Sequence, residues 1–382
     1  MSADLKNFLP GPTMVRPEVL AQLARPIIGH RTPEFRDMMA RISPALQRLF
    51  RTQHPVFSFT CTASAAMEAA LANAGGQNIL ILANGLFGER WGEAAKALGL
   101  KFEVLKFDWG VPLNPGRLEQ KLKRGNYSSV VMVHGETSTG MLNPVEPISA
   151  LTAQLEDVLL IVDAVATLGG VPLQMDEWGI DVLVGASQKC LALPPGIVPL
   201  GVSARAVERS RRSRRKGYAF DFTLWQERWA NGEVVGTPAI PQLYALEYQL
   251  ARIEKEGMEA RWQRHSRLLA LTQEWAQSHG WPPFSKAPEA ALPQRGRGSM
   301  TGRTGTSAAE ALLLPSVSCL IPPGNRDTTP LVATLRRRGY LVDEGHGRLK
   351  AQVVRIGHMG DWQEEDLEGL LRVLGEPHPE AR

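Results

Sequence analysis

Short apolar runs alternate with helical patterns between about residues 56 and 205 of this 382-residue chain. The runs contain almost no polar residue, which is typical of strands that are covered on both faces. The helical patterns between them, such as 64–75 and 88–99, each end at a glycine. This alternation predicts an α/β fold with a doubly wound, mostly parallel sheet. The runs that we predict to be strands are 78–84, 101–108, 128–136, 158–165, 181–187 and 197–203.

A smaller domain is predicted after the large one. A long helical pattern over 241–280 leads out of the large domain, and the tail of the chain then reads as strand, helix, strand and helix. Residues 283–310 are rich in Pro, Gly, Ser and Thr, which predicts a long, partly disordered surface loop. The predicted organisation is an N-terminal segment 1–17, a large domain 18–255 and a small C-terminal α+β domain 256–382.

Charge and cysteine content exclude several classes of function. The net charge is only +4, and the basic run 209–217 has no interleaved aromatic residues, so we expect a solvated surface and no nucleic-acid partner. Cys61, Cys190 and Cys319 lie far apart without metal-binding spacing. The chain has neither a membrane-length apolar run nor an N-terminal signal pattern, so we expect a cytoplasmic protein without a membrane partner.

Two charged residues follow predicted strands of the sheet. Lys189 follows the run 181–187, and Asp163 comes after four apolar residues in the run 158–165. Each has an ordinary interpretation, since a strand-end lysine commonly extends to water and a strand-end aspartate commonly caps a helix. Ligands of such sheets bind at the carboxyl ends of the strands, where both residues are expected.

Two further features stand at other strand ends of the same sheet. Thr60, Thr62 and Ser64 precede a helix, which is either an ordinary cap or a phosphate site at the helix N-terminus. Phe87 lies in a glycine-flanked turn, where it belongs to the core or stacks on a flat ring. A lysine, an acid, a stacking aromatic and a phosphate site are together the parts that pyridoxal phosphate requires.

Several segments also resemble a known family. "GHRTPEF", "NGLFGER", "HGETSTG", "VDAVATLGG", "SQKCLALPPG" and "RIGHMG" are similar to segments of the class V, fold-type I pyridoxal-phosphate aminotransferases. The resemblance is to the branch that contains alanine–glyoxylate and serine–glyoxylate aminotransferases, and it covers nearly the whole chain. It implies pyridoxal 5'-phosphate as cofactor and a homodimer whose active sites lie at the subunit interface.

The resemblance implies a role for each matching residue. Lys189 corresponds to the lysine that holds the cofactor covalently and then moves the substrate proton as general base and acid. Asp163 corresponds to the carboxylate on the pyridine nitrogen, and Gln188 to a residue that contacts the phosphate. Phe87 and Val165 correspond to the residues packed on the two faces of the cofactor ring.

The phosphate site and the shared residues are implied in the same way. Thr62, Ala63 and Ser64 correspond to the phosphate-binding turn, and Thr137 lies near the ring oxygen. Thr237 resembles a threonine that reaches the phosphate of the neighbouring subunit. The turn "TCTASAA" lacks the family's usual glycines, so a position that needs positive φ would be strained. The turn "EGHG" at 344–347 also departs from the family and alters the expected substrate pocket.

The implied function is transfer of an amino group from alanine or serine to glyoxylate or pyruvate by a ping-pong mechanism. Arg355 corresponds to the arginine that binds the substrate α-carboxylate. Arg31 is an open case: inside the site it would favour an anionic donor, aspartate or phosphoserine, and otherwise we expect a loop salt bridge with Glu34.

Two different functions are compatible with the same fold. A cysteine desulfurase needs a cysteine on an exposed mobile loop, whereas Cys319 lies in a predicted buried strand. A non-catalytic hydrogenase-associated subunit would not need Lys189, Asp163 and Arg355, and the sequence shows no iron–sulfur or nickel ligand cluster.

Overall fold

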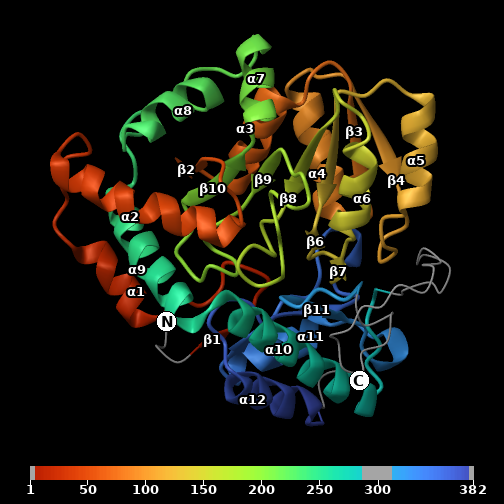
Figure 1. Cartoon of the computed structure of the whole chain (residues 1–382). Helices are drawn as coiled ribbons and strands as arrows, with labels where there is room; N and C mark the ends of the chain where they lie inside the picture. Colours follow the sequence, from red (N-terminus) through yellow and green to blue (C-terminus); the bar gives the residue numbers. More distant parts are fainter. Residues whose placement is uncertain (1–4, 286–311, 378–382) are drawn as a thin grey trace.

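A seven-stranded sheet forms the centre of the large domain in the computed structural model, which describes residues 5–285 and 312–377 (Figure 1). The strand order is β2-β10-β9-β8-β5-β3-β4, and β10 is antiparallel to both of its neighbours while the other pairs are parallel. All six predicted strands are confirmed, and β2 completes the sheet. The strands are β2 (Val56–Thr60), β3 (Ile79–Ala83), β4 (Phe102–Lys106), β5 (Ser129–Val133), β8 (Leu159–Asp163), β9 (Val182–Val184) and β10 (Ile197–Val202).

Helices cover both faces of this sheet, as Figure 1 shows. Every residue of β3, β5, β8, β9 and β10 is buried, which explains their continuous apolar sequences. The doubly wound α/β prediction is therefore confirmed. The helices of this domain are α1 (Pro17–Ala21), α2 (Pro33–Phe50), α3 (Ala63–Ala74), α4 (Leu86–Ala97), α5 (Pro115–Arg124), α6 (Val145–Thr152), α7 (Ala204–Arg212), α8 (Phe222–Ala230) and α9 (Ile240–Glu256).

The long helical pattern over 241–280 forms two helices, not one. Gly257 has a φ of 84°, a left-handed conformation that an α-helix does not continue through, and it separates α9 from α10 (Met258–Ser278). Helix α9 packs into the core around the sheet, whereas Leu268 and Ala276 of α10 belong to a second hydrophobic core. The apolar spacing continues across the break, which is why the sequence pattern did not reveal it.

The small domain is built around an antiparallel pair of strands. Strand β11 (Val317–Leu320) pairs with β13 (Val354–Gly357), and α10, α11 (Thr329–Arg337) and α12 (Glu364–Gly375) complete the domain. The N-terminal segment joins this domain, because β1 (Lys6–Asn7) pairs with β12 (Tyr340–Leu341). Phe8 then stacks on Trp362 at 4.1 Å between ring centroids.

Most of the predicted loop at 283–310 lies outside the described residues. Its first part, up to Ser285, is described and runs beside β11, where Phe284 N–H donates to the Cys319 carbonyl at 2.9 Å. None of the described helices is long and apolar enough to cross a membrane.

Candidate active site

Lys189 lies in a turn after β9, where the large domain meets the N-terminal segment. Its amine donates a hydrogen bond to the Pro10 carbonyl oxygen. Gly11 is required beside it, because a Cβ at this position would lie 2.5 Å from Lys189 Nζ and the φ of Gly11 is +107°. Burial, and next the charge of Arg355, lower the pKa of Lys189 from 10.5 to about 8. About a tenth of this amine is therefore neutral, and hence nucleophilic, at pH 7, and about half of it at pH 8.

The turn that carries Lys189 is anchored by a buried arginine. Arg261 of α10 is 1% exposed, and its Nη2 donates to the Cys190 carbonyl at 2.6 Å. The same guanidinium pairs with Asp361 of the small domain at 3.0 Å. Arg261 thus fixes the peptide next to Lys189 and joins it to the small domain. Nothing in the local sequence around Arg261 indicated this contact.

Asp163 is the last residue of β8 and is 4% exposed. Its carboxylate accepts the Trp91 indole N–H and the Val165 backbone N–H, each at 3.0 Å. Burial raises the pKa of Asp163, while the two hydrogen bonds and the nearby Lys189 charge oppose that rise. Sequence reasoning missed Trp91, although it lies four residues after Phe87 and therefore on the same side of α4.

The N-terminus of α3 lies at the carboxyl end of β2. Thr62 caps this helix, and its hydroxyl accepts the Ala65 N–H at 3.2 Å. The N–H groups of Ala63 and Ser64 belong to the first turn of α3. N–H groups in the first turn of a helix have no acceptor within the helix, and they can therefore bind an anion. The expected strain is absent, because Thr62 has a φ of −83° and no described residue of this turn has a positive φ.

Glu136 fixes the start of α4 and so the position of Phe87. Its fully buried carboxylate accepts the N–H groups of Phe87 and Gly88 at 3.0 and 3.1 Å and the Ser138 hydroxyl at 2.6 Å. The Phe87 ring is partly buried, and the Arg90 guanidinium lies 4.8 Å from its centroid. Glu136 stands in the segment "HGETSTG", but the sequence alone did not indicate that its partner is another helix.

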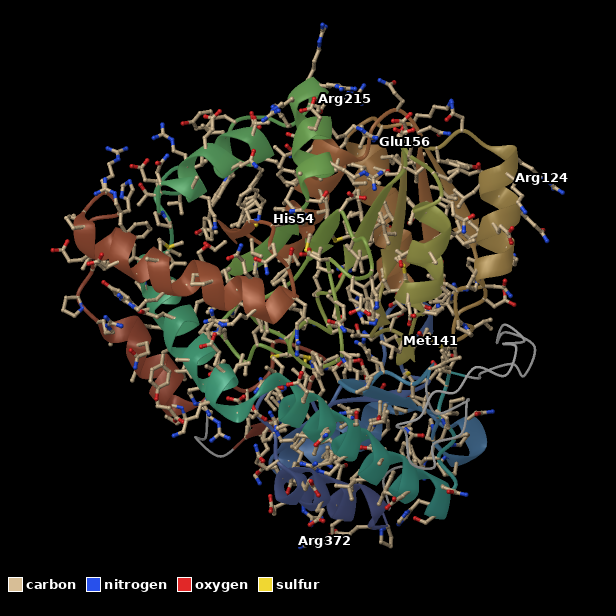
Figure 2. All side chains as sticks on the ribbon, viewed as in Figure 1. His54, Arg124, Met141, Glu156, Arg215 and Arg372 are labelled. Carbon is tan, nitrogen blue, oxygen red and sulfur yellow. The ribbon has the colours of Figure 1, made fainter. Side chains whose placement is uncertain are left out.

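Arg355 reaches the same region from the small domain. Its side chain is 7% exposed; Nε pairs with Asp343 Oδ1 at 2.8 Å, and Nη1 donates to the Thr137 carbonyl at 3.0 Å. Thr137 follows β6 (Gly135–Glu136), whose partner β7 (Met141–Leu142) lies where the two domains meet (Figure 2). Arg355 therefore spans both domains, and its charge is among the causes of the lowered Lys189 pKa.

Val165 and Gln188 adjoin these residues in the chain. Val165 is held by its N–H bond to Asp163, and the Gln188 carbonyl accepts the Thr13 N–H at 3.1 Å. The structure therefore brings Lys189, Asp163, Arg355 and their neighbours together from both domains.

Arg31 and Thr237 are not part of this group within one chain. Both are exposed, Arg31 before α2 and Thr237 before α9. Among the described residues no ion pair joins Arg31 to Glu34, so the expected loop salt bridge is not formed. The loop of Thr237 is tied to β2, since Ala239 N–H donates to the Thr60 hydroxyl at 3.1 Å.

The structure also bears on the cysteines and the basic run. Cys319 is 3% exposed in β11, and burial raises its thiol pKa to about 12, unlike the accessible thiolate that persulfide chemistry needs. In the basic run, Arg211, Arg212 and Arg215 (labelled in Figure 2) are exposed, as predicted, whereas Arg209 and Lys216 are partly buried. Arg215 donates to the Gly99 carbonyl at 2.7 Å, and Arg209 donates to the Asp157 carbonyl at 2.7 Å.

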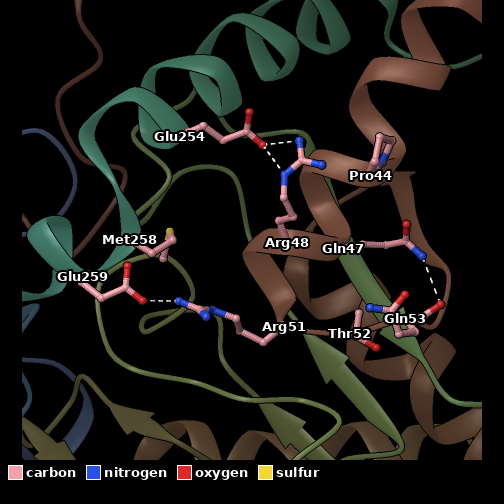
Figure 3. A pocket seen from close by; sticks show the side chains of 9 residues that line it. All are labelled: Pro44, Gln47, Arg48, Arg51, Thr52, Gln53, Glu254, Met258 and Glu259. Atoms are coloured by element: carbon pink, nitrogen blue, oxygen red, sulfur yellow. Dashed lines mark hydrogen bonds and ion pairs between the residues drawn. The ribbon is translucent and has the colours of Figure 1, made fainter.

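A large cavity of about 960 Å³ lies elsewhere, between α2 and the α9–α10 junction (Figure 3). Its charged side chains are already paired: Arg48 with Glu254 at 2.8 Å, and Arg51 with Glu259. It contains none of the predicted site residues, and we assign it no catalytic role.

The chain belongs to the class V aminotransferase family, whose model matches residues 19–369. The cofactor of this family and of its fold-type I relatives is pyridoxal phosphate, and the chain is therefore a pyridoxal-phosphate-dependent transaminase. The donor set fits this group: an amine of lowered pKa for its aldehyde, a buried carboxylate for its ring nitrogen and the N-terminus of α3 for its phosphate.

Three proteins that are similar to this chain illustrate how differently its relatives are named. The chain is 31% identical to the soluble hydrogenase small subunit of Synechococcus sp. strain PCC 6716, covering 96% of this chain and 93% of that one. It is 30% identical to the (S)-ureidoglycine–glyoxylate transaminase of Bacillus subtilis, covering 92% and 85%. The solved alanine–glyoxylate aminotransferase of Nostoc sp. superposes with a TM-score of 0.87 at 28% identity, covering 98% and 95%.

Proposed function

We propose that this protein transfers the amino group of a small neutral amino acid, alanine or serine, to glyoxylate or pyruvate in a ping-pong cycle. The observation that carries the proposal is that Lys189, Asp163 and Arg355 lie close together between the two domains. The amine of Lys189 has a pKa of about 8, so about half of it is neutral at that pH. Glyoxylate as acceptor is supported by the names of relatives that are 27–33% identical to this chain.

Each residue of the group has a defined task in this reaction. Bound pyridoxal phosphate supplies an electron sink for the bond that breaks at the donor's α-carbon. Asp163 supplies negative charge where the ring nitrogen must stay protonated, and Trp91 and Val165 hold its carboxylate in place. Lys189, as general base, would take the proton from the donor's α-carbon and, as general acid, would deliver it to the carbon of the cofactor's aldehyde group. Arg355 orients the donor through its α-carboxylate.

The possibility of a hydrogenase subunit rests on the name of one group of relatives. No group of three or more His, Cys, Asp or Glu side chains is placed to bind a metal ion in the described part of the chain. The Lys189, Asp163 and Arg355 group has no purpose in a non-catalytic scaffold, and this favours the transaminase.

A panel of amino donors tests the substrate class. Because Arg31 lies outside the Lys189 group of its own chain, we expect alanine or serine to give a higher kcat/KM than aspartate or phosphoserine. Arg31→Ala should then leave the order of donors unchanged. If aspartate or phosphoserine is the better donor for the wild type, and Arg31→Ala cancels that advantage, an anionic donor replaces the neutral one in this proposal.

A homodimer is the proposed assembly. Leu20 and Ile27, in the segment around α1, are large apolar side chains that are 45% and 71% exposed, and Thr237 is exposed as well. Burial of such side chains against a second copy is favourable. We expect a dimer in sedimentation velocity at micromolar concentration and weaker association for Ile27→Asp than for Tyr218→Asp, a matched change at another exposed site. A fully active monomer would exclude this assembly.

The compartment is a further part of the proposal. Cys61, Cys190 and Cys319 are all free thiols in the structure. Free thiols fit the reducing conditions of the cytoplasm, where we place the protein.

A further inference from the structure

The carboxylate of Asp343 is held against the guanidinium of Arg355 by side-chain and backbone hydrogen bonds. The two residues exchange backbone hydrogen bonds of 3.1 and 2.8 Å, and Arg355 Nε donates to Asp343 Oδ1 at 2.8 Å. The same oxygen accepts the Gly345 N–H at 2.7 Å. Asp343 therefore cannot turn away from Arg355 without losing bonds on two sides.

The turn after Asp343 is the "EGHG" segment, and its conformation holds the Asp343 carboxylate beside Arg355. Gly345 has a φ of +90°, and a Cβ on it would lie 2.1 Å from the Leu349 carbonyl oxygen, so only glycine fits. A side chain here would move the N–H that holds Asp343. Gly345 is thus a structural requirement of the Asp343–Arg355 pair.

The same segment runs from Arg355 toward the start of α4. Arg348 stacks on Trp109 at 3.8 Å and pairs with Glu89 of α4 at 3.2 Å. A Cβ on Gly347 would lie 3.5 Å from Leu86 Cδ1, next to Phe87 in the chain. Residues 343–348 therefore extend from Arg355, which is expected to hold the donor, to the start of α4, where Phe87 is expected to pack on the cofactor ring.

Because Asp343 binds Arg355, the guanidinium of Arg355 has only one edge left at which it can donate two hydrogen bonds to a substrate carboxylate. A guanidinium offers two such edges, the Nε–Nη2 edge and the Nη1–Nη2 edge. Asp343 occupies Nε, which removes the first edge. Thr137 accepts one Nη1 proton, which leaves the other Nη1 proton and both Nη2 protons for the second edge. Arg355 can therefore bind one substrate carboxylate, beside a carboxylate of the protein.

We propose that Asp343 is a specificity-determining residue that restricts the amino donor to molecules with a single carboxylate. This inference rests on the proposed role of Arg355 in the transaminase reaction. A donor with a second anionic group would bring that charge near Asp343, and like charges brought together in a partly buried site weaken binding.

Asp343→Asn tests the role of the charge while an amide oxygen keeps the two hydrogen bonds. We expect the ratio of kcat/KM for aspartate to that for alanine, with glyoxylate as acceptor, to rise about tenfold or more, as for removal of a like-charge contact. Glu344→Gln is the matched control, since Asp343 and Glu344 side chains are both 26% exposed but Glu344 pairs with Lys350 instead. In this control we expect the ratio to change less than about twofold.

A binding measurement gives a second readout on the holoenzyme. We expect calorimetry to show that Asp343→Asn strengthens succinate binding relative to propionate binding by about tenfold, with no such change in Glu344→Gln. Unchanged ratios in Asp343→Asn, or equal changes in the two variants, overturn the proposal. If Asp343 had only a structural role, Asp343→Asn would lower kcat/KM for both donors, and the affinity for both carboxylates, by similar factors. Both ratios would then stay unchanged. If the wild type transfers amino groups from no donor, the proposed function fails, and the succinate-to-propionate ratio still decides the role of Asp343.

Discussion

Lys189→Ala is expected to lower amino transfer by about two to four powers of ten, since the general base and acid is removed and covalent attachment of the cofactor is lost as well. The native amine is buried, bonded to Pro10 and has a pKa of about 8, a set of properties that no methyl group reproduces. Steady-state rates with alanine and glyoxylate give the measurement. Lys189→Arg, which keeps the positive charge, should be as inactive as Lys189→Ala.

Lys216→Ala is the matched control for this prediction. Lys216 is also largely buried, with its side chain 17% exposed, but it pairs with Asp221 in a surface loop. We expect turnover within about twofold of the wild type in this variant. Wild-type turnover in Lys189→Ala would contradict the assignment.

The pH dependence of cofactor uptake follows from the same pKa. Only the neutral amine attacks an aldehyde, so the rate at which the apoprotein takes up pyridoxal phosphate should fall as pH drops below about 8 and level off above it. An ordinary lysine of pKa 10.4 would be only about 0.4% neutral at pH 8 and would give a midpoint near 10.4. A midpoint near that higher value, measured by absorbance after mixing, would show that Lys189 is not the reacting group.

Asp163→Asn is expected to lower the rate by at least about two powers of ten. The substitution preserves the shape of the side chain and removes the negative charge that holds the proton of the ring nitrogen. Loss of one partner of a buried pair costs about 3–5 kcal/mol, and 1.36 kcal/mol in the barrier is a factor of ten. The readout is kcat with the cofactor saturating, so that weaker cofactor binding does not contribute.

A second buried aspartate provides the control for Asp163. Asp181 lies at the opposite end of the sheet, is 3% exposed, and bonds to Ser203 at 2.7 Å and to the Leu160 N–H at 3.0 Å. Burial raises the pKa of both carboxyls. Asp181→Asn should reduce the stability and leave kcat nearly unchanged. Equal loss of kcat in both variants would show that Asp163 acts through the fold and not through the cofactor.

The sheet was predictable from the sequence because its strands are buried along their whole length. A short continuous apolar run, such as the one that ends at Asp163, is typical of a strand that is covered on both faces. The residues after the strands could be placed together for the same reason, since parallel strands end at one edge. Lys189 and Asp163 were found in this way.

The residues that the sequence did not reveal act through contacts distant along the chain. Trp91 meets Asp163 across 72 positions, and Glu136 meets Phe87 across 49. Arg261 reaches Cys190 across 71 positions. Asp343 is closer, 12 positions from Arg355, but their pairing depends on the register of two backbone hydrogen bonds and on Gly345. Hydrophobic periodicity contains no information on such polar pairs.

The identity of the lysine that carries pyridoxal phosphate is measurable without any substrate. Borohydride reduction of the yellow holoprotein fixes the cofactor to its lysine, and mass spectrometry of the proteolytic peptides locates it. We predict that the label is found on Lys189, in the peptide that contains the Ser187–Cys190 turn. Label on a different lysine, or a protein that stays colourless and unlabelled when pyridoxal phosphate is added, would contradict the assignment of this site.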